Sequence, residues 1–216
     1  MARQNFSNSV YLSKATALVT ATPLTLACFV NPAALSTDAI MVCIGQSGSD
    51  ANMWDVQIPA ASKQVWAETG STAAGFDHSL DGLSAITTGA FVHVAAVFAS
   101  PTSRIAYRNG VAGATNATSI TPTSLSPGSS VIGNSTGKDN RVNGTVAWVG
   151  IWAAALLQPE IAALSQGCHP RRIRPASLVA ALNLTGGLSP EPDMVNATGW
   201  TVTGALTEIG NPRIFY

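Results

Sequence analysis

An alternating run followed closely by an Asn-Gly pair is the sequence feature that most constrains the fold of this chain. Side chains alternate between two faces over Phe91–Phe98, and a period of two indicates a β-strand. A second strand is predicted at Arg104–Arg108, and Asn109-Gly110 follows it at once. This pair tolerates the positive φ angles that both central residues of a tight hairpin turn require. The stretch therefore predicts an antiparallel meander whose third strand begins at Val111.

Several other stretches have a strand-like pattern and are separated by turn residues. The further predicted strands span residues 9–14, 24–30, 40–44, 54–58, 63–68, 131–132, 145–152 and 177–184. Asn31-Pro32 is expected to end the second of these, because proline has no N–H to donate to a strand ladder. Residues 71–83 are rich in Gly, Ser and Asp and are expected to form a loop. Trp148 and Trp152 alternate in phase with Val146, so all three are predicted to lie in one core.

One short helix is predicted near residues 159–165. Pro159 and Glu160 favour a helix start, and Gly167 favours its end. Many strands at a spacing of roughly 8–12 residues, joined by Gly, Pro and Ser turns, predict an all-β, two-sheet antiparallel sandwich. We divide the chain into this sandwich at residues 1–169 and a C-terminal extension at residues 170–216. The extension is expected to pack on the sandwich or on a neighbouring subunit.

Composition limits the classes of partner. The 216 residues carry no formal net charge, which gives no indication of a nucleic acid or a membrane surface as partner. Charged residues make up 10%, against about 25% in a typical soluble domain. Part of the surface is therefore expected to be covered by a partner, such as further copies in a homo-oligomer. A soluble monomer with a Thr-, Ser- and Ala-rich surface is the alternative.

Apolar runs, the N-terminal segment and the cysteines indicate the cellular compartment in which we expect the protein to fold. No apolar run reaches the roughly 18 residues that a spanning helix needs. The segment after Lys14 is interrupted by threonines and Pro23, so we expect a folded N-terminus without a signal peptide. Cys28, Cys43 and Cys168 lack metal-type spacing, and reduced thiols in a cytoplasmic setting are the simplest interpretation, although Cys28 and Cys43 could pair across two adjacent strands.

Motifs between Val10 and Ser165 carry a resemblance to a known family. In chain order they are PLTLACFVNPAAL, GAFVHVAAVF, RIAYRNGV, NGTVAWVGIWAAAL and PEIAAL. Together they resemble the laminin-G-like, concanavalin A-like lectin jelly roll, and they depart from its pattern at Phe91, where the family has tryptophan. The resemblance covers about three quarters of the chain and implies a jelly-roll sandwich, while it says little about a ligand.

The C-terminal part of the chain points to a virion. From Cys168 to Tyr216 the sequence is similar to the C-termini of laminin-G-like proteins encoded in bacteriophage and prophage genomes. The expected function is therefore a non-enzymatic virion protein, made in the host cytoplasm, that decorates or cements a capsid and contacts the major capsid protein. The alternative is a carbohydrate-binding module, on a tail or receptor-binding assembly, that binds a surface glycan.

Catalytic chemistry is not expected. Glycoside hydrolases on this jelly roll need two facing carboxylates, and we expect the strands that face a groove to be nearly free of acids. His93 lies on the predicted meander and is expected to be structural, while His78 and His169 fall in predicted loops. No cofactor is expected. Calcium is a minor possibility, for which rim-loop oxygen ligands would come from Asp50, Asn52 and Asp55, or from Asp139, Asn140 and Asn143.

Aromatic and basic residues give the last candidates. Trp54, Trp66, Trp148 and Trp152 would stack on sugars if they were exposed, but a core position is the favoured interpretation. Arg171, Arg172 and Arg174 form the one basic cluster, and together with Trp200 they are candidates for partner contact. Trp200 would otherwise anchor the tail on its own domain.

Overall fold

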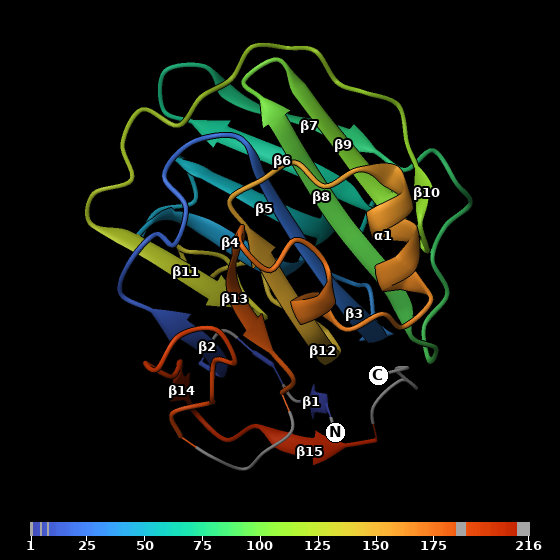
Figure 1. The fold of residues 1–216 in the computed structure, drawn as a ribbon, viewed down its shortest axis with the longest axis vertical. Helices are drawn as coiled ribbons and strands as arrows, with labels where there is room; N and C mark the ends of the chain where they lie inside the picture. Colours follow the sequence, from blue (N-terminus) through green and yellow to red (C-terminus); the bar gives the residue numbers. More distant parts are fainter. Residues whose placement is uncertain (1, 5, 8, 185–188, 211–216) are drawn as a thin grey trace.

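The chain folds into two facing antiparallel sheets (Figure 1). The computed structural model describes residues 2–4, 6–7, 9–184 and 189–210. Sheet A runs in the order β10 (Val111–Ala112), β9 (Ser103–Arg108), β8 (Val92–Ser100), β3 (Leu24–Ala34), β12 (Asn143–Trp152), β1 (Ala2–Gln4) and β15 (Thr207–Ile209), with β13 (Leu178–Leu182) also paired to β12. Sheet B runs in the order β14 (Thr201–Thr203), β2 (Tyr11–Lys14), β11 (Gly128–Ile132), β4 (Ala39–Gln46), β5 (Met53–Ile58), β6 (Trp66–Ser71) and β7 (Gly75–Leu80). The predicted two-sheet sandwich is confirmed.

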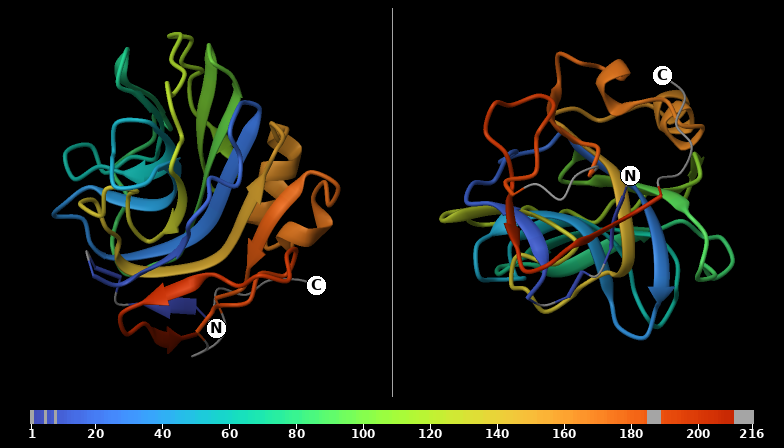
Figure 2. Two further views of the ribbon diagram at one scale, coloured as in Figure 1. Left: turned by 90° about the vertical axis from the view of Figure 1, so that its left-hand side faces the viewer. Right: turned by 90° about the horizontal axis from the view of Figure 1, so that it is seen from below.

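The predicted meander is present as β8, β9 and β10. Asn109 and Gly110 form its turn with φ angles of 49° and 81°. Val94 and Phe98 on one face of β8 lie in the core between the sheets, whereas Ala95 and Val97 on the other face pack outside sheet A. Helix α1, orange in Figure 2, packs against this outer face through Ile161 and Leu164. Both faces of β8 are therefore buried.

The helix is also where the sequence places it. Helix α1 spans Gln158–Ser165, and a short 3-10 turn, η1, follows at Pro170–Arg172. The Glu160 carboxylate accepts a hydrogen bond of 2.6 Å from the Leu157 backbone N–H, and Gly167 ends the helix with a φ of 93°. No helix among the described residues is long and apolar enough to cross a membrane.

Strand β3 is longer than predicted. It continues through Pro32 to Ala34, although Asn31-Pro32 was expected to end it. The pairing with β8 stops at Val30, while the pairing with β12 continues. Proline is tolerated there because the strand has become a local edge, where no neighbouring strand needs a donor on that side.

Strand β7 lies where a loop was predicted, so that expectation was wrong. It pairs with β6 at the edge of sheet B. Its inward side chains are polar: Asp77 faces Arg104 of sheet A at 3.9 Å, and the Ser79 hydroxyl donates to the Ala114 carbonyl. The outward side chains Phe76 and Leu80 are exposed. The apolar alternation that marks a strand is therefore inverted, and the sequence pattern does not reveal it.

A bulge in β12 changes which face its tryptophans occupy. The pairing of β12 with β3 shifts between Ala147 and Gly150, and Trp148 has a φ of 51°. Val146 lies in the core between the sheets, but Trp148 and Trp152 lie on the outer side of sheet A. The prediction of one shared core was wrong, because an extra residue in a bulge reverses the alternation beyond it.

The C-terminal strands join both sheets of the same chain. β15 pairs with β1 in sheet A, and β14 pairs with β2 in sheet B. Trp200, just before β14, is fully buried in the core between the sheets, and its indole N–H lies 3.3 Å from an Asp193 carboxylate oxygen. Arg3 of β1 forms a buried ion pair with Glu191. Figure 1 shows these N- and C-terminal strands gathered at one end of the sandwich.

Replacement of Trp200 by alanine should therefore destabilise the whole domain. We expect Trp200→Ala to lower the free energy of unfolding by about 3–5 kcal/mol, because it removes a large fully buried side chain. Urea denaturation followed by circular dichroism measures this. Leu157→Ala, which removes an exposed side chain, should change the value by no more than about 0.5 kcal/mol. A similar small effect of Trp200→Ala would show that the tail is not part of the cooperative unit.

Candidate functional site

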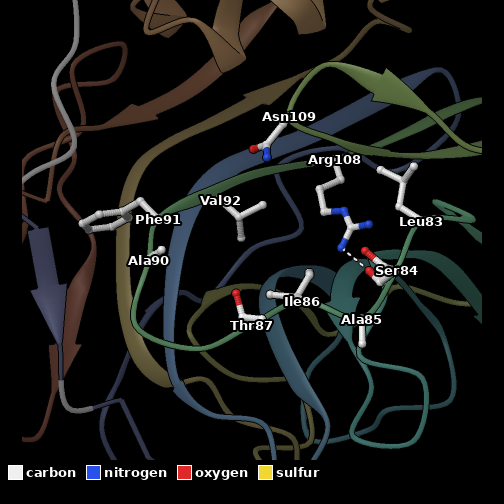
Figure 3. Close-up of a pocket in the computed structure, with 10 residues that line it drawn as sticks. All are labelled: Leu83, Ser84, Ala85, Ile86, Thr87, Ala90, Phe91, Val92, Arg108 and Asn109. Carbon is white, nitrogen blue, oxygen red and sulfur yellow. Dashed lines mark hydrogen bonds between the residues drawn. The ribbon is translucent and has the colours of Figure 1, made fainter.

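A cleft at the rim of the sandwich is the clearest hollow among the described residues. It lies between the chain that follows β7 and the ends of β8 and β9, and has a volume of about 420 Å³ (Figure 3). This size is within the range of small-molecule sites. Its lining residues are Leu83, Ser84, Ala85, Ile86, Thr87, Ala90, Phe91, Val92, Arg108 and Asn109.

Arg108 supplies fixed hydrogen-bond donors to this rim cleft. Its side chain points into the cleft in Figure 3. Nε lies 3.1 Å from the Asp81 carboxylate, and Nη1 donates to the Ser84 carbonyl at 2.7 Å. Nη2 has no hydrogen-bond partner within the described part of the chain. The ion pair holds the guanidinium in place, so that this group is positioned for a ligand.

Asn109 and Phe91 complete the polar and aromatic lining. The Asn109 side-chain oxygen accepts a hydrogen bond of 2.9 Å from the His93 backbone N–H, which fixes the side chain beside the cleft. Phe91 is partly exposed and packs against Trp148 on the outer side of sheet A. An aromatic ring beside fixed donors is a common arrangement in sites for polar small molecules.

A second hollow adjoins the first. It has a volume of about 410 Å³ and shares Ala85, Ile86 and Thr87 with the rim cleft, so that these three residues separate the two. Lys63 lines this second hollow. An extended ligand would therefore have room on both sides of the segment formed by residues 85–87.

The outer face of sheet B holds an acid pair that the sequence analysis missed. Asp55 of β5 and Glu68 of β6 are direct partners across the two strands, and both point away from the core. Asp55 is completely buried and Glu68 is 8% exposed. The expectation that such strands lack acids was therefore wrong, because Asp55 was assigned to the neighbourhood of a loop and the strand register that pairs it with Glu68 is not visible in the sequence.

Burial and mutual repulsion shift the titration of both acids. Burial raises the pKa of Asp55 well above its usual range, and the charges of Glu68, Asp50 and Asp38 raise it further. Burial also raises the pKa of Glu68 to about 7, although a hydrogen bond from the Gln57 side chain opposes this shift. The pair consequently retains protons at a pH where ordinary carboxyls have lost them.

The side chains of two calcium candidates, Asp50 and Asn52, take part in hydrogen bonds within the chain. Asp50 accepts hydrogen bonds from the Ser135 hydroxyl and the Gly137 backbone N–H, while Asn52 bonds Gln46 and the backbone of Thr123. The other candidates lie in β5, in the segment before β12 and at the first residue of β12; they are Asp55, Asp139, Asn140 and Asn143. Within the described ranges, no three His, Cys, Asp or Glu side chains gather closely enough to hold a metal ion.

His93, Cys168 and His169 lie on the outer side of sheet A, whereas His78 lies on the outer face of sheet B. His93 and Cys168 line the same small cavity beneath α1, a pairing that the sequence could not indicate. Burial lowers the pKa of His93 to about 3, so its imidazole is neutral. His169 caps η1 and bonds the Asn183 side chain at 2.9 Å, while His78 stacks on Trp66. The cavity has room for about one water molecule, so it offers no substrate site.

The partner-contact candidates differ in their exposure. Arg171 and Arg172 are exposed on η1, whereas Arg174 donates to Glu160 at 2.7 Å. Trp200 lies in the core of its own chain and presents no surface to a partner. Contact through the two exposed arginines stays a prediction.

A comparison with protein families identifies the fold family. The model for the concanavalin A-like lectin/glucanases superfamily matches residues 5–162. The chain belongs to this family. A search of curated proteins finds no match.

Solved structures of low sequence identity share the fold. A candidate carbohydrate-binding protein from Bacteroides ovatus has a TM-score of 0.70 and 17% identity, over 98% of this chain and 60% of its own. Domain 4 of the arabinanase AbnA from Geobacillus stearothermophilus, in complex with arabinotriose, has a TM-score of 0.59 and 18% identity, with 74% of each chain covered. The CBM40 domain of the Ruminococcus gnavus IT-sialidase, bound to α2,3-sialyllactose, has a TM-score of 0.55 and 12% identity, over 68% of this chain and 84% of its own.

The raised pKa values of Asp55 and Glu68 predict that the free energy of unfolding falls as the pH rises. Its folded-state pKa values lie above those of an unfolded chain, near 4, so the folded state binds more protons between about pH 4 and 7. The free energy of unfolding should fall over this window, with roughly 1–3 kcal/mol of the fall due to the pair. Urea titrations at several pH values should show a smaller fall for Glu68→Gln than for the unchanged chain. Asp139→Asn, at an exposed carboxylate, should leave the slope unchanged, and equal slopes for all three proteins would contradict the assignment.

Proposed function

We propose that this protein is a non-catalytic carbohydrate-binding module that binds a glycan in the rim cleft. The observation that carries the proposal is the cleft itself, which Arg108, Asn109 and Phe91 line together, with Arg108 held by Asp81 and Asn109 held by the His93 backbone N–H. Sugars present hydroxyl groups around a ring with apolar C–H faces, so they fit a site that combines hydrogen-bond donors with an aromatic surface.

The relatives support this class of function. The Bacteroides ovatus protein is described as a candidate carbohydrate-binding protein, and the arabinanase and sialidase domains were solved with oligosaccharides bound. Family membership covers lectins and glucanases alike, so fold alone does not separate binding from catalysis. The choice between them rests on the acids of this chain.

Burial of the acid pair favours binding over hydrolysis. A glycosidase needs two carboxyl groups that both reach the scissile bond. Both carboxylate oxygens of Asp55 are closed off from solvent, so a sugar outside the sheet would not touch them. The rim cleft has one acid beside it, Asp81, and that carboxylate is held by Arg108.

The virion role expected from the sequence gains no support from the comparisons, whose relatives are lectin-like domains. Decoration of a capsid and contact with a capsid protein therefore stay predictions that rest on the resemblance of the tail, and homo-oligomerisation stays a prediction that rests on the low charged fraction. A module on a tail or receptor-binding assembly would reconcile glycan binding with a virion.

Removal of the Phe91 ring should weaken glycan binding. A glycan array with the labelled chain identifies the ligand, and isothermal titration calorimetry then compares variants. Phe91→Ala should lower the affinity by roughly 5- to 50-fold, because it removes the aromatic surface that the sugar ring contacts. Leu157→Ala, at an exposed apolar residue on the border of α1, is the matched control and should bind as the unchanged chain does. An array without signal, or a Phe91→Ala variant of full affinity, would refute the proposal.

A further inference from the structure

The outer face of sheet B carries a row with two acids, Asp55 and Glu68, that no cation in the described chain pairs with. Cys43, Asp55, Glu68 and His78 are successive partners across β4, β5, β6 and β7. Neither Asp55 nor Glu68 takes part in any ion pair of the described residues. Both Asp55 carboxylate oxygens are buried without a hydrogen-bond partner. A fully buried carboxyl group in this condition is unfavourable unless a proton or another cation accompanies it.

The charged groups around Asp55 and Glu68 do not supply the missing cation. Asp38, from the β3–β4 connection, and Asp50, from the β4–β5 connection, add negative charge. Lys138, from the β11–β12 connection, donates to the Ser135 and Thr136 carbonyls and lies over the Tyr11 ring. Burial lowers the pKa of His78 on β7, while Asp77 opposes the shift. Cys43 is buried, and burial together with the Asp55 charge raises its pKa, so it stays a neutral thiol.

Aromatic side chains border the same row. Phe76 of β7 is 53% exposed, and its ring lies over Gly70, where an added Cβ would come within 2.6 Å of the ring. Trp66 and His78 are stacked with their ring centres 3.4 Å apart. Gly70 and Glu68 lie two residues apart on one face of β6, a separation of about 7 Å along a strand. The exposed ring and the Glu68 carboxylate are thus about one sugar unit apart.

We propose that this face is a second carbohydrate site, specific for sugars that carry a free, protonated amine. The sugar ring packs on Phe76, and the ammonium group donates to the carboxylate of Glu68, a residue that is 8% exposed. Asp55 lies beside Glu68 on the neighbouring strand and does not touch the sugar, because both its carboxylate oxygens are buried. The inference goes beyond the function proposed for the rim cleft and does not depend on that cleft.

Binding at this face is coupled to proton release. Without a ligand, the pair keeps a proton because two adjacent buried carboxylates repel each other. When the ammonium group arrives, Glu68 loses its proton to the solvent and becomes a carboxylate, while the amine keeps its own proton. The ligand cation takes the place of the bound proton, and the charge of the site stays balanced.

Calorimetry with glucosamine oligomers tests the proposal on the full chain. The probes are the glucosamine tetramer and its fully N-acetylated counterpart, at about pH 6, where a sugar amine is protonated. We expect the free-amine tetramer to bind about 10- to 100-fold more tightly, the range for loss of a hydrogen bond between charged groups. Titrations in two buffers with different heats of ionisation should show net proton release for the free-amine probe alone.

Three variants assign the binding to this face. Glu68→Gln should lose the preference for the free amine, and it removes a repulsion, so it should fold; a thermal melt checks this. Asp139→Asn makes the same change of charge at an exposed position in the β11–β12 connection and should bind as the unchanged chain does. Phe91→Ala, in the rim cleft, should also leave binding of the amine probe intact.

The outcomes separate this inference from the proposed function. Equal binding of both tetramers, or full affinity of Glu68→Gln, would overturn the inference. Binding that is lost in Phe91→Ala and kept in Glu68→Gln would place the sugar in the rim cleft, which supports the proposed function and overturns the second site. If neither tetramer binds and Glu68→Gln instead abolishes self-association, the missing cation comes from another copy of the chain, and the inference is again wrong.

Discussion

Strand β12 is the element on which the rest of the sandwich depends, because it is paired along both edges. One edge pairs with β3 over most of its length. The other edge is divided between β1, next to Thr145 and Val146, and β13, next to the residues from Val149 to Trp152. Three strands from distant parts of the sequence, β1, β3 and β13, therefore all pair with β12. Because of the bulge at Trp148, apolar side chains of this strand fill the core between the sheets, while its two tryptophans pack on the outer side of sheet A.

The sequence predicts the parts of this fold that follow regular periodicity. The meander around Asn109-Gly110, the central strand β4 and helix α1 were all predicted, because each shows a local pattern with a local stop signal. The errors arise where a tertiary contact overrides the local pattern. Pro32 is tolerated since its strand has lost a neighbour, β7 turns polar side chains inward toward Arg104, and the bulge in β12 reverses the faces of Trp148 and Trp152.

The candidate sites were less predictable than the fold, for the same reason. Arg108 ends β9 and Asn109 begins the turn to β10, so both could be placed at a rim. The segment that closes the cleft, around Ser84 and Ile86, has no sequence pattern that positions it. Asp55 and Glu68 are thirteen residues apart in the sequence. Only the register of β5 and β6 makes them neighbours, and registers between strands depend on turns and packing that a single sequence does not display.

The pairing of the two ends of the chain has a consequence for how the protein is made on the ribosome. β1 lies between β12 and β15, and β2 lies between β11 and β14, so strands within residues 2–14 stay unpaired on one side until strands beyond residue 200 have been synthesised. Because β14 and β15 fall within residues 201–209, the two sheets are not both complete until residue 209 has left the ribosome. Until then the nascent domain exposes unpaired strand edges and core side chains, which is the condition under which β-rich chains aggregate. A truncated or stalled chain would therefore be prone to aggregate and would not form a smaller version of the same sandwich.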